Sequence, residues 1–337
     1  METILVTGDI VLDCHLYGGV KTAATSFREP GTVYAEHLGG AALTHELVAA
    51  AADAKGLAWD DKKKKWDEEN RRRLQNGKAA LPRPDDLAED RPSPIFATRL
   101  DIDTQRLKST LPGHLRSYGV WTEQPARKGA KDRVWRVERH FGYGPTVPLT
   151  QGNTFKRNPI QSATAPILTL IDDGGILFRH RTSQSAWPEL STKAGCQYLL
   201  KMSSPLCRSD LWAELAPVME QLIVVVAAVD LRCEDTQINA RLSWEQCAQD
   251  TMRALQSDPI ARDLLRAAHV VVSFRSAGAL WVERGQDDQS PTHHLLFDPT
   301  MLEGDYSLRF DGTAYGFQTC LTAGIAHHLM QIGRAHV

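Results

Sequence analysis

The second half of the chain alternates strand-like and helix-like segments, and this alternation constrains the fold more than any other feature. Strands are predicted at the apolar runs 167–171, 198–202, 222–229, 270–274 and 279–282, with a short extended segment at 295–297. Helices are predicted over 209–221, 243–255, 259–268 and about 318–330. Strands that alternate with helices of roughly ten to fifteen residues form a mostly parallel sheet with helices on both faces. The sequence therefore predicts an α/β fold.

The first half is less regular. Residues 3–7 and 10–12 are strand-like, and an alanine-rich helix is expected over 41–54. A highly charged stretch follows, in which Lys62 to Lys65 and Arg71 to Arg73 are mixed with acidic residues. Mixed signs favour a solvated helix or a disordered insertion, which we place at about 55–130. The proline- and aspartate-rich segment 81–94 is typical of a loop. Apolar and charged residues alternate over 133–140, which favours a strand or hairpin. We therefore expect a small β lid around Arg133 to Gly142.

Composition narrows the range of partners. Lysines and arginines number 39 against 41 acidic residues, a balance that argues against a general nucleic-acid binder. The longest apolar run, 222–229, is too short to span a bilayer, and the first residues lack the pattern of a signal peptide. We therefore expect a cytoplasmic protein with no membrane partner. The six cysteines form no CxxC pair, and the adjacent histidines 293–294 and 327–328 are poor co-ligands, so no metal site is expected.

The last six residues, Ile332 to Val337, read as the in-frame translation of a common sequencing-library adapter. We therefore expect the natural chain to continue past Gln331 and to include a further C-terminal domain. The alternative is a genuine short basic tail. On the first interpretation, residues 1–331 form one α/β domain that carries the charged insertion.

Carboxylates follow several of the predicted strands. In open α/β sheets, ligands bind beyond the carboxyl ends of the strands, where Asp9, Asp172, Asp173 and Asp230 stand. The run Asp172-Asp173-Gly174-Gly175 could hold Mg²⁺ or could cap a turn. We expect the turn, because aspartate and glycine are typical turn residues.

Three motifs carry a resemblance to a known family. The opening Gly8-Asp9-Ile10-Val11-Leu12-Asp13, followed by Gly18, resembles the GDxxxDxxxxG start of sugar kinases of the ribokinase (PfkB) family. It is most similar to the branch that phosphorylates heptose phosphates. Gly39-Gly40-Ala41-Ala42 resembles the di-glycine motif that lies beside the sugar in that family. The segment from Gly316 to Gly324 lines up with the family signature GAGDxFxAG.

The resemblance implies a ribokinase-like three-layer α/β/α fold and a site for a small sugar or nucleotide, with ATP and Mg²⁺ as cofactors. Asp9, Asp13, Gly39 and Gly40 would then bind the substrate, although Asp9 and Asp13 could simply cap the turn after the first strand. Gly278, Gly316, Gln318 and Thr319 would bind the nucleotide. In the family, glycine N–H groups at this turn stabilise the phosphoryl group in flight. An aspartate there takes the proton from the sugar hydroxyl.

The chain departs from the family at several chemical positions. Thr319 stands where the family has its catalytic aspartate, and a threonine hydroxyl is not a useful base near pH 7. Gln318 replaces the second glycine of the signature, Leu43 replaces a sugar-binding asparagine, and Arg275 replaces a glycine of the nucleotide-side LGxxG. Asp311 lies near the lost base but two residues from the position of the family's other aspartate. The catalytic candidates are therefore Asp311 and Thr319.

Two classes of function remain open. The first is a catalytically degenerate descendant of a sugar kinase that binds a nucleotide or sugar-like ligand as a sensor or scaffold module of a longer protein. The second is an active ATP- and Mg²⁺-dependent carbohydrate kinase whose base has moved to Asp311 or Asp13. Several independent departures at chemical positions favour the first. A domain that only contacts protein partners is a third interpretation.

Overall fold

The computed structural model describes the backbone of most of the regular elements of this chain. The described residues are 2–8, 10–17, 33–88, 90–100, 122–124, 135–141, 148–149, 153–154, 166–173, 190–192, 195–202, 209–228, 231, 244–259, 261–274, 278–285, 290–296 and 317–335.

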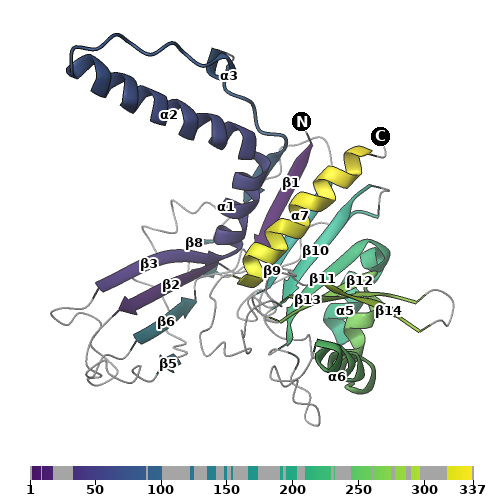
Figure 1. Ribbon diagram of the computed structural model, residues 1–337. Coiled ribbons are helices and arrows are strands. Elements are labelled where there is room, and N and C mark those ends of the chain that lie inside the picture. Colours follow the sequence, from purple (N-terminus) through teal and green to yellow (C-terminus); the bar gives the residue numbers. More distant parts are fainter. Residues whose placement is uncertain are drawn as a thin grey trace.

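The principal feature is an eight-stranded, mostly parallel sheet with the order β14-β13-β12-β11-β10-β9-β1-β4 (Figure 1). Its strands are β1 (Thr3–Gly8), β4 (Ala97–Leu100), β9 (Leu168–Asp173), β10 (Gln197–Met202), β11 (Leu222–Ala227), β12 (His269–Ser273), β13 (Ala279–Glu283) and β14 (Thr292–Leu296). The pairs from β4 through β12 are parallel, whereas β13 and β14 extend the sheet antiparallel. The predicted α/β fold with a mostly parallel sheet is confirmed.

The helices follow the expected connections. They are α1 (Ala41–Ala52), α2 (Ala54–Gln75), α3 (Asp85–Ala88), α5 (Ser209–Leu215), α6 (Trp244–Ser257) and α7 (Phe317–Ala335), with the 3₁₀ helices η1 (Ala216–Gln221) and η3 (Ala261–Arg266). The helix expected over 209–221 changes type after Leu215. Pro217 lies at the start of η1, and proline lacks the N–H that would continue the α-helical hydrogen bonds. The segment expected from Pro259 is the shorter η3, and the side chain of Asp258 accepts the N–H of Ala261 at its start, 2.9 Å away.

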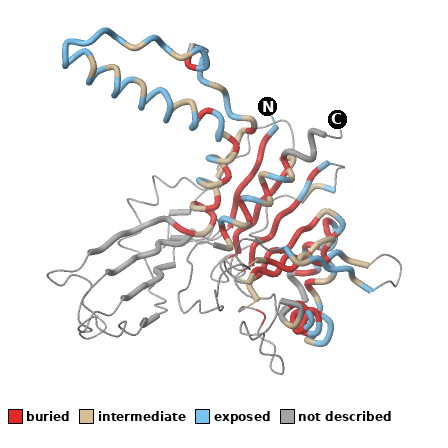
Figure 2. The backbone as a smooth tube through the Cα atoms, viewed as in Figure 1, coloured by how far each residue is buried: buried red, intermediate tan, exposed pale blue. Residues whose placement is uncertain are grey.

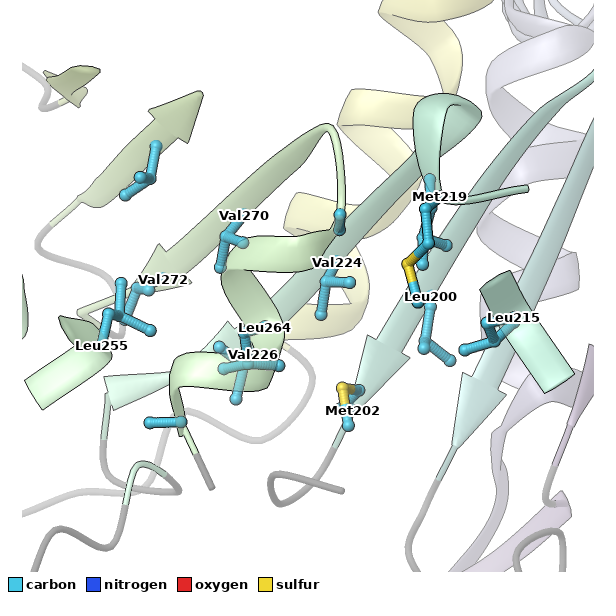
Figure 3. Packing of buried hydrophobic residues seen from close by; sticks show 14 of the residues in the cluster. Leu200, Met202, Leu215, Met219, Val224, Val226, Leu255, Leu264, Val270 and Val272 are labelled. Carbon is cyan, nitrogen blue, oxygen red and sulfur yellow. The ribbon is translucent and has the colours of Figure 1, made fainter. Parts of the chain in front are cut away.

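A hydrophobic cluster lies on each face of the sheet. Because side chains alternate along a strand, β11 contributes Val224 and Val226 to one cluster and Ile223 and Val225 to the other. The first cluster also contains residues of α5, η1, α6 and η3, and Figure 3 shows part of this packing. The second contains residues of α1 and α7, which pack against each other. Burying each large aliphatic side chain stabilises the fold by about 1.5–3 kcal/mol, so the two clusters hold the sheet between its helices.

A second, four-stranded antiparallel sheet has the order β3-β2-β6-β5 and lies to one side of the main sheet (Figure 1). Its strands are β2 (Ile10–Tyr17), β3 (Val33–Gly40), β5 (Thr122–Gln124) and β6 (Trp135–Phe141), and a separate short hairpin pairs β7 (Pro148–Leu149) with β8 (Asn153–Thr154). The strand expected around 133–140 is therefore present as β6. Strands β2 and β3 are inserted between β1 and α1, whereas β5 and β6 come from the segment between β4 and β9.

The charged stretch forms a projecting arm, defined here as residues 54–94. Figure 1 shows α2 extending away from the main sheet with the chain returning beside it, and Figure 2 shows that most of its residues are exposed. The return segment is attached by polar contacts: Trp66 Nε1 donates to Pro82 O at 3.1 Å, and Asn70 Oδ1 accepts the N–H of Leu81 at 2.8 Å. The expected solvated helix is confirmed over this part.

The boundaries predicted for the insertion are wrong. Residues 97–100, which fall inside the expected range of 55–130, form strand β4 and pair with β1 in the main sheet. Four residues of low hydrophobicity, Ala97-Thr98-Arg99-Leu100, give too short a pattern to be identified as a strand from sequence.

Within the described residues, none of the helices is both long enough and apolar enough to cross a membrane.

Candidate functional site

The carboxyl ends of the parallel strands meet at one edge of the sheet, which we call the carboxyl edge. Gly8 at the end of β1 is in register with Asp172 of β9, and Asp172 is in register with Lys201 of β10. Helices α1 and α7 both begin at this edge: α1 follows Gly40, and Gln318 in the first turn of α7 bonds to the last residue of β10. Glycines, ionisable groups and two helix starts are thus brought together where ligands bind in open α/β folds.

A buried ion pair lies at the centre of the carboxyl edge. Lys201 Nζ donates to both oxygens of Asp172, at 2.9 and 2.8 Å, and Thr44 Oγ1 donates to Asp172 Oδ2 at 2.5 Å. Asp172 is 1% exposed, Lys201 8% and Thr44 0%. The three residues come from β9, β10 and α1, so this group links two strands to the helix that opens beside them. Because the Asp172 carboxylate already accepts three charge-assisted or hydroxyl contacts, it is an anchor rather than a free base.

A turn was expected over Asp172 to Gly175, of which the structure describes only Asp172 and Asp173. Both residues are the last positions of strand β9, because pairing with β10 continues through Lys201 and Met202. Asp173 is fully buried as well. The two aspartates themselves therefore belong to the strand, and Asp172 is held there by Lys201 and Thr44, partners that sequence patterns do not show.

Two glycines shape the edge. A Cβ added at Gly8 would lie 2.1 Å from the carbonyl oxygen of Asp172, and Gly8 has a φ of 128°. No residue other than glycine fits there, so β1 can end in close contact with β9. Gly40 has φ 59° and ψ −137° at the junction of β3 and α1, and Gly39 beside it is buried. The di-glycine motif singled out from sequence therefore makes the turn from the second sheet into α1.

The first turn of α7 is fixed to the main sheet by Gln318. Its Nε2 donates to the carbonyl oxygens of Met202 and Val225, at 3.0 and 3.3 Å, and Thr322 Oγ1 donates to the carbonyl oxygen of Gln318 at 2.6 Å. Thr319 is 5% exposed. A side chain at 318 thus occupies the space between the helix start and strands β10 and β11. In a GAGD signature this position is a glycine with no side chain.

The remaining predicted residues are only partly placed. Asp9, Asp311 and Gly316 lie outside the described residues. Asp13 belongs to β2, in register with His37 of β3 and Arg139 of β6. Gly278 has a φ of 143° at the turn between β12 and β13, where its carbonyl oxygen accepts the N–H of Phe274 at 2.8 Å.

The structure brings these predicted residues together in three groups. Asp13, Gly39 and Gly40 share the second sheet, since Gly39 and Gly40 are in register with Val11 and Ile10. Gln318 and Thr319 lie at the start of α7, which packs beside the helix that follows Gly40. Gly278 lies separately, beyond the carboxyl end of β12.

Sequence reasoning missed Lys201 and Thr44. Lys201 lies within the apolar run 198–202, which was predicted as a strand and is part of β10. A lysine in such a strand is costly unless it is paired, so it could have been identified as the partner of a strand-end aspartate. Thr44 gave no such signal, because a threonine in an alanine-rich helix is ordinary. Among the described residues, no group of three His, Cys, Asp or Glu could hold a metal ion.

The carboxyl edge thus combines three features. They are the buried ion pair of Asp172 and Lys201, the close-packed glycines Gly8 and Gly40, and the start of α7, where the side chain of Gln318 bonds to the sheet. Each of these features is a property of the chain and of the register of its strands. No protein-family model matches this chain, and a comparison with curated proteins finds no match either.

Proposed function

We propose that the chain is a ribokinase-like, three-layer α/β/α domain that binds a nucleotide or sugar-like ligand at the carboxyl edge without transferring a phosphoryl group. The hydrophobic clusters on both faces of the sheet, each with helix residues, support the layered fold. Strands β2 and β3 of the second sheet, which leave the main fold after β1 and return at the start of α1, support a lid beside the edge. In this proposal the domain acts as a sensor or scaffold module.

The observation that carries the proposal is the first turn of α7. Phosphoryl transfer needs unobstructed N–H groups at this turn and a carboxylate that accepts the proton of the attacking hydroxyl. Here Gln318 places a side chain between the turn and the sheet, bonded to Met202 O and Val225 O, and the buried Thr319 supplies a hydroxyl instead of a carboxylate. The two changes are adjacent and act against the same chemical step, which favours binding over catalysis.

The described residues fit a nucleotide better than they fit a protein-bound Mg²⁺ ion. A nucleotide is compatible with the turn at Gly278, whose positive φ and missing Cβ allow a ligand to approach the backbone closely. Asp172, by contrast, is committed to Lys201 and Thr44 and does not suit a divalent cation. Any Mg²⁺ would therefore be held mainly by the phosphates and water of its nucleotide, as is common for this ion.

A second candidate is an active carbohydrate kinase with a displaced base, Asp311 or Asp13. It is favoured by the intact di-glycine turn, because Gly40 adopts a conformation that side chains rarely allow and still opens α1 beside α7. In the second sheet, Asp13 lies on the strand paired with the one that ends in this turn.

One experiment separates the two candidates. The full chain is titrated by calorimetry with ATP and Mg²⁺, with ADP, and with a panel of sugars and nucleosides, while transfer of the γ-phosphate is followed in the same samples. Saturable binding without transfer is the expected result. Transfer that is abolished by Asp311→Asn or Asp13→Asn, and retained by the matched arm variant Asp67→Asn, would establish the kinase instead. Failure of every ligand to bind would remove both candidates.

A further inference from the structure

A pocket lies at the opposite edge of the main sheet from the proposed ligand site. Its volume is about 510 Å³, within the range of about 300–1,000 Å³ typical of small-molecule sites. It is lined by the first residues of β10 and β12, the last residue of the antiparallel β13, and His328 and Leu329 in the second half of α7. It therefore occupies the amino edge, on the face of the sheet that α7 covers.

An aromatic wall forms one side of the pocket. The rings of Trp281 and His269 lie 5.2 Å apart between centroids, tilted by 51°. Trp281 is only partly buried against the hydrophobic cluster beneath it, so part of its ring remains available to a ligand. Ile223 and Leu329 add apolar surface nearby. A flat apolar group would gain contact area here, and a cation near an exposed indole gains a further attraction to its ring.

Two residues that line the pocket each carry a polar atom without a hydrogen-bond partner within the described part of the chain. The atoms are Gln221 Oε1 and His269 Nδ1, and both are buried. Gln221 Nε2 donates to Thr192 O at 3.5 Å, which leaves the oxygen as the free end of the amide. Burial lowers the pKa of His269 although the nearby Glu283 carboxylate opposes the shift, so the ring is neutral at pH 7 and one nitrogen can accept. Both unpaired atoms are hydrogen-bond acceptors, which favours a ligand that carries donors and positive charge.

The charged residues of the pocket favour a cationic ligand. Its described lining contains Glu220 and Glu283 and no lysine or arginine. Glu220 is paired with Arg284, whose guanidinium also donates to Arg266 O at 3.1 Å. Glu283 is exposed and forms no ion pair with another described residue. One carboxylate therefore remains for a ligand cation.

We propose that this pocket binds a small aromatic amine, with its ring against Trp281 and its ammonium group donating to Glu283. The unpaired buried atoms of Gln221 and His269 are acceptors, and an alkylammonium on an aromatic ring combines a cation for Glu283 with a flat group for the aromatic wall. This site is separate from the carboxyl edge and does not depend on the function proposed there.

The test is a titration of the full chain with tryptamine and with phenethylamine, by calorimetry and by ligand-observed nuclear magnetic resonance. Tryptophol and indole-3-propionate, which are neutral and anionic, serve as matched ligands without the ammonium group. We expect saturable binding of the amines and at least about tenfold weaker binding of the two analogues. Glu283→Gln and Trp281→Leu should each weaken tryptamine binding by about tenfold or more. Glu214→Gln, an exposed change on α5, should leave it unaltered.

Three results would overturn the proposal. They are the absence of saturation by either amine up to about 5 mM, equal binding of tryptophol, and unchanged binding in the folded Glu283→Gln variant. Circular dichroism of each variant distinguishes a lost contact from a lost fold. Because Mg²⁺ and ATP are predicted to act at the other edge, their addition should not displace tryptamine.

Discussion

Replacing Lys201 by methionine tests the role of the buried ion pair at the carboxyl edge. Methionine has a similar length and can fill the same space, but it removes the ammonium group that contacts both oxygens of Asp172. Asp172 is 1% exposed, so its carboxylate would keep only the hydroxyl of Thr44 and almost no water. The variant therefore leaves a buried charge without its counter-charge.

The size of the effect follows from the geometry. Two unit charges 2.8 Å apart attract by roughly 6 kcal/mol at an effective dielectric constant of about 20, and desolvation of both groups offsets much of this. Removing one partner alone usually costs about 3–5 kcal/mol, which is the loss in unfolding free energy expected for Lys201→Met. Thr44→Val should cost about 1.5–3 kcal/mol, because it removes one hydrogen bond to a charged acceptor. The double variant Lys201→Met with Asp172→Asn should recover most of the loss.

The assay is urea unfolding, monitored by tryptophan fluorescence and by far-ultraviolet circular dichroism. Fluorescence reports on the fold because Trp212 is fully buried in the cluster on one face of the sheet. Lys64→Met, a change of the same chemistry on the exposed side of α2, is the matched control and should stay within about 0.5 kcal/mol of the parent. The reasoning is refuted if Lys201→Met stays within about 1 kcal/mol of the parent. It is refuted equally if the double variant is no more stable than Lys201→Met.

Three further outcomes can be measured by the same unfolding assay. Gly8→Ala should cost at least about 3 kcal/mol, because its Cβ would lie 2.1 Å from Asp172 O, whereas Gly77→Ala, also at positive φ but with nothing within 4 Å, should cost only about 1–2 kcal/mol; equal losses would contradict this. Gln318→Leu should cost about 1–3 kcal/mol by removing both bonds to strand carbonyls, and an unchanged urea midpoint would show that the anchor is unimportant. Burial lowers the pKa of His45, so the unfolded chain binds more protons below about pH 6.5 and stability falls as the pH drops through that range; His45→Gln should flatten this fall between about pH 7.5 and pH 5, and an identical slope would count against it.

The elements that sequence predicted well are those whose pattern is purely local. The run Leu222-Ile223-Val224-Val225-Val226 can only be a buried strand, and it is β11 at the centre of the sheet. The amphipathic spacing of 243–255 likewise predicted α6 to within two residues at its end. The order of the strands and the antiparallel turn at β13 do not follow from such patterns, because they depend on which surfaces meet in three dimensions.

The candidate site was less accessible to sequence than the fold. Its Gly39-Gly40 pair was singled out from sequence through a resemblance to a family motif, whereas the close contact at Gly8 was not predicted. Its ion pair was not predicted either, because Asp172 and Lys201 are 29 residues apart and become neighbours only through the parallel register of β9 and β10. The anchoring role of Gln318 was hidden for the same reason: its acceptors, the carbonyls of Met202 and Val225, carry no side-chain signature.

The attachment of the projecting arm bears on how this chain can change its length over evolution. The N–H of Ile95 donates to Ala52 O at 3.0 Å, so the residues that enter and leave the arm already meet. Just beyond this point, Arg91 bonds to both Asp53 and Asp60 and fastens the base of the arm from outside the sheet. Everything between these contacts is a closed excursion from the main fold. Ancestral chains could therefore have acquired, extended or lost residues 54–94 as a unit, with the order and register of the eight strands left unchanged.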